Sequence, residues 1–348
     1  MAHRPFLVLA ASWCASAAPA GSSFVVLKRG HSGSTWFSTL LLDFEKTFFL
    51  DEAVSASGFA KMASPFHNHS AFEEYLLRAL SEPMGKFVRK KKRVEWDRQL
   101  NGTKACFKNP ACDTTLWTFG LSLAPLGLGC RSHPAPWFPT VLDSLVRSRP
   151  SLKFVILLRT NVVKMSLSHM GDKKTLGTLP EEDRRLVEEN PTLDPDDFFV
   201  KCLVSIIRNA NLRALAPGHG AAVREVYYEA LQLDTPGEMD KVRDFLGIPK
   251  RDDVKFVSTS VKLGTDDLRS RIANFDEVSA SFAERSPCLH DMLHATVPLV
   301  HEPCPLPDGV NATGPTMPCH RSKVPLSTHE THRHDQPKKE STDAPAGS

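Results

Sequence analysis

The sequence predicts an α/β protein in which a central parallel sheet lies between two layers of helices. Residues 24–27 have the composition of a strand that is buried on both faces, residues 152–159 are similar, and residues 222–228 form a third apolar segment. Each is followed by residues with helical spacing. Because strands that alternate with helices are typical of parallel sheets, we expect a three-layer α/β/α architecture.

The residues after the first strand and its glycine-containing turn predict one long helix. Apolar side chains recur at helical spacing over residues 34–49, with Trp36, Leu40, Phe44 and Phe48 on one stripe. The later elements are expected in this order: a helix over 139–148, a strand over 152–159, a helix over 160–170, a strand over 222–228 and a helix over 239–246.

Length and composition allow one large domain with tails. The chain has 348 residues, of which 41% are hydrophobic and 24% charged, as in ordinary globular domains. Its formal net charge of +3 is too small to favour nucleic acid as a partner, so any anion site must be local. Residues 21–300 are predicted to form the domain, and the Pro-, His- and Lys-rich residues 301–348 to form a disordered tail.

The N-terminus has the order of a secretory signal peptide. Residues 1–20 contain a basic start, an apolar run too short for a membrane span and a small-residue stretch. Sequons at Asn68, Asn101 and Asn311 agree with that route. We therefore expect a glycoprotein of the secretory pathway, in the Golgi lumen or secreted, with a cytoplasmic location as the alternative. Loss of residues 1–20 would leave an odd number of the eight cysteines, so their pairing stays open.

The turn after the first strand has the composition of an anion-binding loop. Residues 28–36 read Lys-Arg-Gly-His-Ser-Gly-Ser-Thr-Trp, between a strand and a helix. A loop in this place directs backbone N–H groups and the positive end of the helix dipole at one anion. Gly30 and Gly33 allow close approach of the backbone, because a Cβ would block it. The hydroxyl donors of the loop are Ser32, Ser34 and Thr35.

An ATP-dependent kinase with a Walker A loop is the main alternative for this motif. That loop requires a Lys after its last glycine, and no Lys follows Gly33. The strand over 152–159 ends in Arg159 rather than in an acidic residue that would hold Mg²⁺. The residues around this loop thus lack both the Lys and the Mg²⁺-binding carboxylate of a kinase, so we expect an anion site without a metal.

A second anion motif follows the strand over 152–159. Arg159 ends the strand, and Ser166 and Ser168 follow on the next predicted helix. A guanidinium fork and a helix hydroxyl can hold a phosphate from two sides. Ser168 lies on the face of the helix start, and Ser166 is rotated from it by roughly 200°. Ser168 is therefore favoured, with Ser166 as the open alternative.

Together the two motifs resemble those of the PAPS-dependent sulfotransferases, which use 3′-phosphoadenosine 5′-phosphosulfate (PAPS) as donor. Residues 30–36 resemble the 5′-phosphosulfate loop, and residues 157–168 resemble the 3′-phosphate motif. Further segments look like the family's Tyr-Glu-x-Leu and Phe-Leu-Gly segments and like the C-terminal segment of its bacterial and algal glycolipid-type members: residues 226–231, 242–249 and 262–278. The resemblance runs from about residue 24 to residue 278.

The resemblance implies a fold similar to that of the P-loop NTPases and an enzyme that moves a sulfonate group from PAPS to a hydroxyl or amine, with PAP as product. It also implies a small-molecule, carbohydrate or lipid acceptor, close to a Golgi membrane. It does not indicate the oligomeric state. The implied nucleotide-binding residues are Arg29, Gly30, His31, Ser32, Gly33, Ser34, Thr35, Trp36, Arg159, Ser168, Tyr228 and Lys262.

The catalytic residues implied by the resemblance are His31, Glu52 and Lys108. Sulfonate transfer requires a base for the acceptor's proton and positive charge at the leaving phosphate. Glu52 is the expected base, with the adjacent Asp51 as a second candidate. The chain departs from the family at His31, where relatives carry Lys or Arg, and Lys28 or Arg29 could substitute for that charge. This departure leaves a noncatalytic nucleotide- or glycan-binding relative as a further alternative.

Overall fold

A computed structural model describes residues 22–30, 32–44, 46–54, 69–81, 118–124, 138–170, 191–250, 256 and 267–306, with backbone alone at 51–54 and 69–72. All of them belong to one compact unit, Met1–Pro318. The predicted signal peptide and residues 307–348 lie outside this range, so the domain boundaries and the disordered tail stay predictions.

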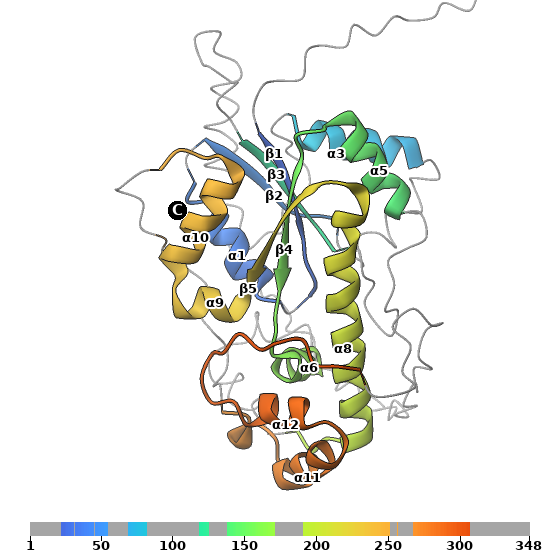
Figure 1. Ribbon diagram of the computed structural model, residues 1–348, viewed down its shortest axis with the longest axis vertical. Coiled ribbons are helices and arrows are strands. Elements are labelled where there is room, and N and C mark those ends of the chain that lie inside the picture. Colours follow the sequence, from blue (N-terminus) through green and yellow to red (C-terminus); the bar gives the residue numbers. More distant parts are fainter. Residues whose placement is uncertain are drawn as a thin grey trace, which may run out of the picture. The chain divides into compact units, whose positions relative to one another are not determined.

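A parallel sheet forms the centre of the protein (Figure 1). In the described part of the chain its strands are β1 (Ser23–Leu27), β2 (Thr47–Val54), β3 (Thr118–Leu123), β4 (Lys153–Leu158) and β5 (Ala222–Tyr227). Their spatial order is β2-β3-β1-β4-β5, and every neighbouring pair is parallel. The predicted α/β class with a central parallel sheet is confirmed.

Helices cover both faces of the sheet because both faces are apolar. Successive strand residues point to opposite sides, so Val25 and Leu27 belong to one core, and Phe24 and Val26 to another. The first core includes α3 (His69–Ala79), α5 (Phe138–Ser148) and the C-terminal end of α8 (Pro195–Leu215). The second core includes α1 (Ser34–Leu41), α9 (Tyr228–Leu233) and α10 (Thr235–Leu246). This is the predicted α/β/α sandwich.

A separate helical core lies where β4 continues into α6 (Val162–Met170). It joins α6, the N-terminal half of α8, α11 (Phe275–Arg285) and α12 (Pro287–His294), as Figure 1 shows. Helix α8 reaches both this core and the sheet. It starts at Pro195 because the Asp194 carboxylate accepts hydrogen bonds from the N–H groups of Asp196 and Asp197. Among the described helices none is long and apolar enough to cross a membrane.

The predicted helix over residues 34–49 is wrong in its second half. Helix α1 ends at Leu41, a turn with Lys46 at φ 48° follows, and the rest becomes β2. Phe44 and Phe48 are both buried, but they enter cores on opposite faces of the sheet. Pairing of the Phe-Phe-Leu run with β3 overrides the helical period, as burial often does for β-prone residues. The predicted elements from residue 139 onward are confirmed as α5, β4, α6, β5 and α10.

A disulfide between Cys288 and Cys304 joins α12 to the chain that follows it, across a sequence separation of 16. A cross-link over a loop of this length restricts the unfolded chain and contributes about 3 kcal/mol. We therefore expect the Cys288→Ser/Cys304→Ser variant to lose about 3 kcal/mol of unfolding free energy, measured by urea denaturation without reductant. An equal urea midpoint for the variant and the unmodified protein would contradict this pairing.

Candidate functional site

Both predicted anion motifs lie at one point of the sheet edge. Strands β1 and β4 are neighbours, and the chain leaves β1 toward β2 on one side and β4 toward β5 on the other. Where connections of adjacent parallel strands part in this way, a crevice forms outside their carboxyl ends, and ligands bind there. The loop over residues 28–33 and the loop over residues 159–161 border this point.

Gly33 shapes the first loop at the start of α1. Its φ of 77° and ψ of 16° place it in the left-handed region, which L-residues with a Cβ rarely adopt. A Cβ at this position would overlap the Tyr228 ring. Gly33, the N-cap residue of α1, has no side chain that could cap the helix. The N-terminus of α1 adjoins this loop, and the N-terminus of a helix favours an anion.

Tyr228 connects the two loops. Its ring packs edge-on against Trp36, with centroids 5.6 Å apart and an interplanar angle of 82°. The guanidinium carbon of Arg159 lies 4.9 Å from the centroid of the same ring. One aromatic side chain, at the start of α9, thus contacts Gly33 in the first loop, Trp36 in α1 and Arg159 in the second loop.

The second loop places Ser168 beside Arg159. Nη1 of Arg159 lies 3.5 Å from Oγ of Ser168, at the long end of hydrogen-bonding distance. Ser166 instead is buried and shares a 2.9 Å hydrogen bond with Ser205 on α8. The Ser168 hydroxyl donates to the Lys164 carbonyl at 2.8 Å, so it can accept from Arg159. The choice of Ser168 over Ser166 as a phosphate ligand stays a prediction.

Arg29 is buried beneath the first loop and points toward α8. Its Nη1 donates to the Ser205 carbonyl at 3.0 Å and to Oδ1 of Asn209 at 3.4 Å, which are both neutral acceptors. Its Nη2 is buried and, among the described residues, has no hydrogen-bond partner. Burial, and next the charge of Arg208, lower the pKa of Arg29 well below its ordinary value. A buried cation with neutral partners is stabilised by an anion nearby.

Asn209 links the two loops through its amide. Oδ1 accepts from Arg29 of the first loop, and Nδ2 donates to the Arg159 carbonyl of the second at 3.0 Å. The side chain is buried on α8 and so holds both loops against one rigid element. Reasoning from the sequence missed this residue, because nothing in the helical pattern around it marks it.

Glu229 fixes the start of α6. Its buried carboxylate accepts hydrogen bonds from the N–H groups of Thr160 and Asn161, both at 3.0 Å. The N–H groups just before α6 are therefore already paired, and Asn161 caps the helix by accepting from the Lys164 N–H at 2.9 Å. The sequence marked the Tyr-Glu segment only by resemblance and did not predict this role.

Some of the other predicted site residues lie in the described part of the chain, and some do not. The hydroxyl of Ser32 donates to the Arg29 carbonyl at 2.8 Å, which closes the turn of the first loop. Ser34 is buried and Thr35 exposed at the start of α1. Glu52 lies in β2 instead of after a helix, near the carboxyl end of that strand. The side chain of Glu52 and the whole of His31, Lys108 and Lys262 lie outside the described residues.

Within the described ranges no group of three or more His, Cys, Asp or Glu side chains is placed to hold a metal ion.

Comparisons with known proteins identify no relative by sequence: no family model and no curated protein matches. Among solved structures, a sulfotransferase from Alicyclobacillus acidocaldarius is 13% identical, with a TM-score of 0.34, over 78% of this chain and 94% of that one. A sulfotransferase from Mycobacterium avium is 11% identical, with a TM-score of 0.34, over 77% and 76%. A sugar kinase from Janibacter sp. is 17% identical, with a TM-score of 0.27, over 66% and 95%. At such TM-scores these similarities do not distinguish one activity from another.

Proposed function

We propose that this protein transfers a sulfonate group from PAPS to a hydroxyl or amine of an acceptor. The observation that carries the proposal is the position of Tyr228, whose ring contacts both Gly33 and Arg159. A ligand that reaches both loops needs anionic groups at two separate places. PAPS has them, a 5′-phosphosulfate and a 3′-phosphate on one ribose, whereas ADP and ATP carry phosphates at the 5′ end alone.

The described residues fit such a nucleotide. The N-terminus of α1 after Gly33 and the buried guanidinium of Arg29 suit the 5′-phosphosulfate. Arg159 and Ser168 suit the 3′-phosphate, because a guanidinium fork binds a phosphate by two parallel hydrogen bonds. We also propose that Lys262 contacts the 3′-phosphate, as the resemblance in sequence implies.

The reaction is a direct displacement at sulfur. The acceptor oxygen or nitrogen attacks the sulfur while the bond from sulfur to the bridging oxygen breaks; the electron pair stays with PAP, and the acceptor's proton passes to a base. Positive charge near the leaving phosphate stabilises the transition state. In this proposal His31 and Lys108 supply that charge, and Glu52 is the base. A carbohydrate or glycolipid acceptor and a secretory location belong to the same proposal and follow from the resemblance in sequence.

Calorimetric binding of PAP, ADP and ATP tests the proposal. We expect PAP to bind without Mg²⁺ and about 10- to 100-fold more tightly than ADP, because a charge-assisted phosphate contact contributes about 1.5–3 kcal/mol. Tighter binding of ATP with Mg²⁺ would indicate the kinase alternative. PAP binding without transfer to any of a panel of sugar, lipid and phenol acceptors would indicate the noncatalytic one.

Asn209→Leu should weaken PAP binding by about tenfold, because it removes the amide that joins both loops at a cost of about 1–2 kcal/mol. AMP contacts only the first loop in this proposal, so its affinity should change less. Calorimetry with both nucleotides gives the ratio of the two affinities, which a general loss of stability would leave unchanged. Asn211→Leu, two residues along the same helix, is the matched control. Equal losses for PAP and AMP would exclude a linking role.

A further inference from the structure

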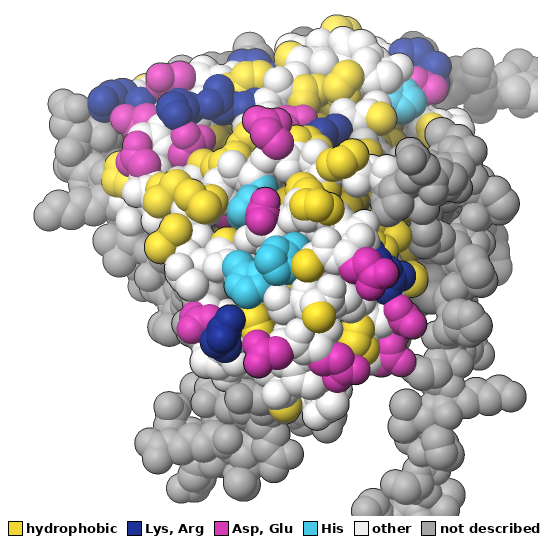
Figure 2. Space-filling model, turned by 60° about the horizontal axis from the view of Figure 1, so that its bottom comes forward, with side chains coloured by type: hydrophobic (Ala, Val, Ile, Leu, Met, Phe, Trp, Pro, Cys, Tyr) yellow, Lys and Arg dark blue, Asp and Glu magenta, His cyan; other side chains and the backbone are white. Residues whose placement is uncertain are grey.

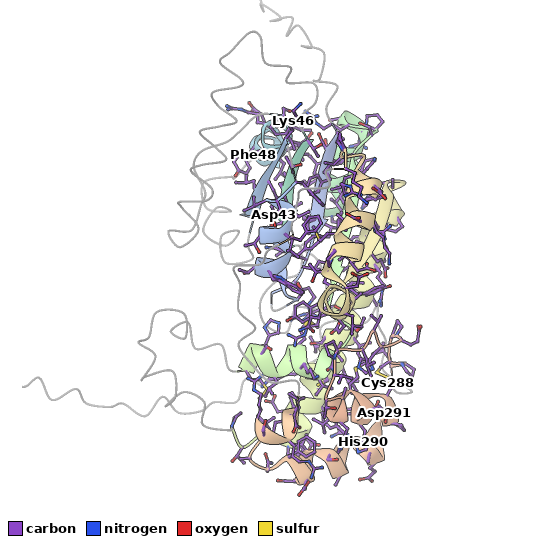
Figure 3. All side chains as sticks on the ribbon, turned by 90° about the vertical axis from the view of Figure 1, so that its left-hand side faces the viewer. Asp43, Lys46, Phe48, Cys288, His290 and Asp291 are labelled. Atoms are coloured by element: carbon purple, nitrogen blue, oxygen red, sulfur yellow. A yellow bond between two sulfur atoms is a disulfide. The ribbon has the colours of Figure 1, made fainter. Side chains whose placement is uncertain are left out.

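Two histidines stand one helical turn apart on the outer side of α12. His290 and His294 have ring centroids 4.5 Å apart. The opposite side of α12 is buried through Leu289, Met292 and Leu293. Figure 3 labels His290 beside Asp291 at the end of the helical core, and Figure 2 shows histidine side chains gathered on the exposed surface of this part of the protein. The proposed nucleotide site does not use these residues.

The two imidazoles point at one position. Nε2 of His290 lies 3.2 Å, and Nε2 of His294 2.8 Å, from the same atom, Oγ of Ser279 on α11. A hydroxyl has a single proton, so it can donate to one of these nitrogens at a time. Two ring nitrogens that converge on one point, from positions i and i+4 of a helix, have the arrangement that chelates a metal ion.

A carboxylate lies beside the His290 ring nitrogen that does not face Ser279. On His290, Nδ1 lies 4.0 Å from a carboxylate oxygen of Asp291. Nε2 of His290 is the nitrogen that lies near Ser279 and can serve as the ligand atom.

We propose that His290 and His294 form a binding site for a late first-row divalent cation such as Zn²⁺, Ni²⁺ or Cu²⁺. Imidazole nitrogen suits these ions, whereas Mg²⁺ and Ca²⁺ prefer oxygen ligands. The two nitrogens provide half of a four-coordinate shell, and water or the Ser279 hydroxyl completes it. The site does not depend on the proposed sulfonate transfer.

The test titrates Zn²⁺ and Cu²⁺ into the full chain by calorimetry. Three further histidines of the sequence, His329, His332 and His334, are first replaced by alanine, because they could bind the same ions. We expect this background protein to show one saturable site, tighter for Cu²⁺ than for Zn²⁺ and silent for Mg²⁺. Binding should be lost in the same protein with His290→Ala/His294→Ala, and the Cu²⁺ electron paramagnetic resonance spectrum should show nitrogen splitting in the background protein alone. Unchanged Zn²⁺ affinity in the double variant, or a background protein that binds no Zn²⁺, would overturn the proposal.

A gain of affinity supplies a second, independent measurement. Ser279→Asp places a carboxylate oxygen at the point on which both nitrogens converge, and should tighten Zn²⁺ binding. Ser279→Ala keeps both imidazoles without the added ligand, so its affinity should stay near that of the background protein. If Ser279→Asp binds Zn²⁺ no more tightly than Ser279→Ala, the two nitrogens do not share one position and the site is refuted.

Discussion

Arg159→Gln should weaken PAP binding by about 100-fold, because truncating one partner of a charge-assisted phosphate contact costs about 2–5 kcal/mol. AMP lacks the 3′-phosphate, so its affinity should stay within about twofold of the starting value. Arg159→Lys keeps the charge but loses the planar fork, so its PAP affinity should be about tenfold below that of the unmodified protein. Calorimetry of each variant with PAP and AMP measures the selectivity directly.

Arg213→Gln is the matched control for this series. Arg213 lies in the last turn of α8, where its Nε is 3.3 Å from a carboxylate oxygen of Glu225 in β5. It carries the same charge and a similar degree of burial without contacting either loop, so PAP binding should not change. If Arg159→Gln instead weakens PAP and AMP to the same extent, Arg159 does not recognise the 3′-phosphate, and the proposed donor is wrong.

The strands that the sequence predicts most clearly are those with a continuous run of large apolar residues. β1 and β4 contain such runs, whereas Gly120 interrupts β3. In the structure a Cβ on Gly120 would overlap the Phe24 ring, which packs over it from β1. The small residue thus serves a long-range contact that the local pattern does not reveal. The same holds for Phe48, whose helical spacing hides its place in β2.

The two loops of the candidate site are predictable because their chemistry is local: glycines and hydroxyls next to a strand, and an arginine at a strand end. The groups that hold these loops are not local. Asn209 lies 50 residues from Arg159 and 180 residues from Arg29, and only the packing of α8 brings them together. Arg29 itself shows the limit of local reasoning, since its side chain is directed into the protein against Ser205.

Gly33→Ala should cost about 2–5 kcal/mol of unfolding free energy and abolish PAP binding. About 1–2 kcal/mol comes from a Cβ at positive φ, and about 1–3 kcal/mol from overlap of that Cβ with the Tyr228 ring. Urea denaturation measures the loss of unfolding free energy, and calorimetry measures the loss of PAP binding. Gly218→Ala is the control: a Cβ there meets nothing within 4 Å, so the change should stay within about 0.5 kcal/mol.

A double-mutant cycle with Tyr228→Ala separates the two parts of this cost. Removing the ring relieves the overlap and leaves the strain of the backbone, so Gly33→Ala should cost about 1–2 kcal/mol in the Tyr228→Ala background. The two changes are then strongly non-additive. Additive costs would mean that the Tyr228 ring does not lie against Gly33. In that case the contact that brings Arg159 and the first loop to one nucleotide is absent, and the bridging ligand must be abandoned with it.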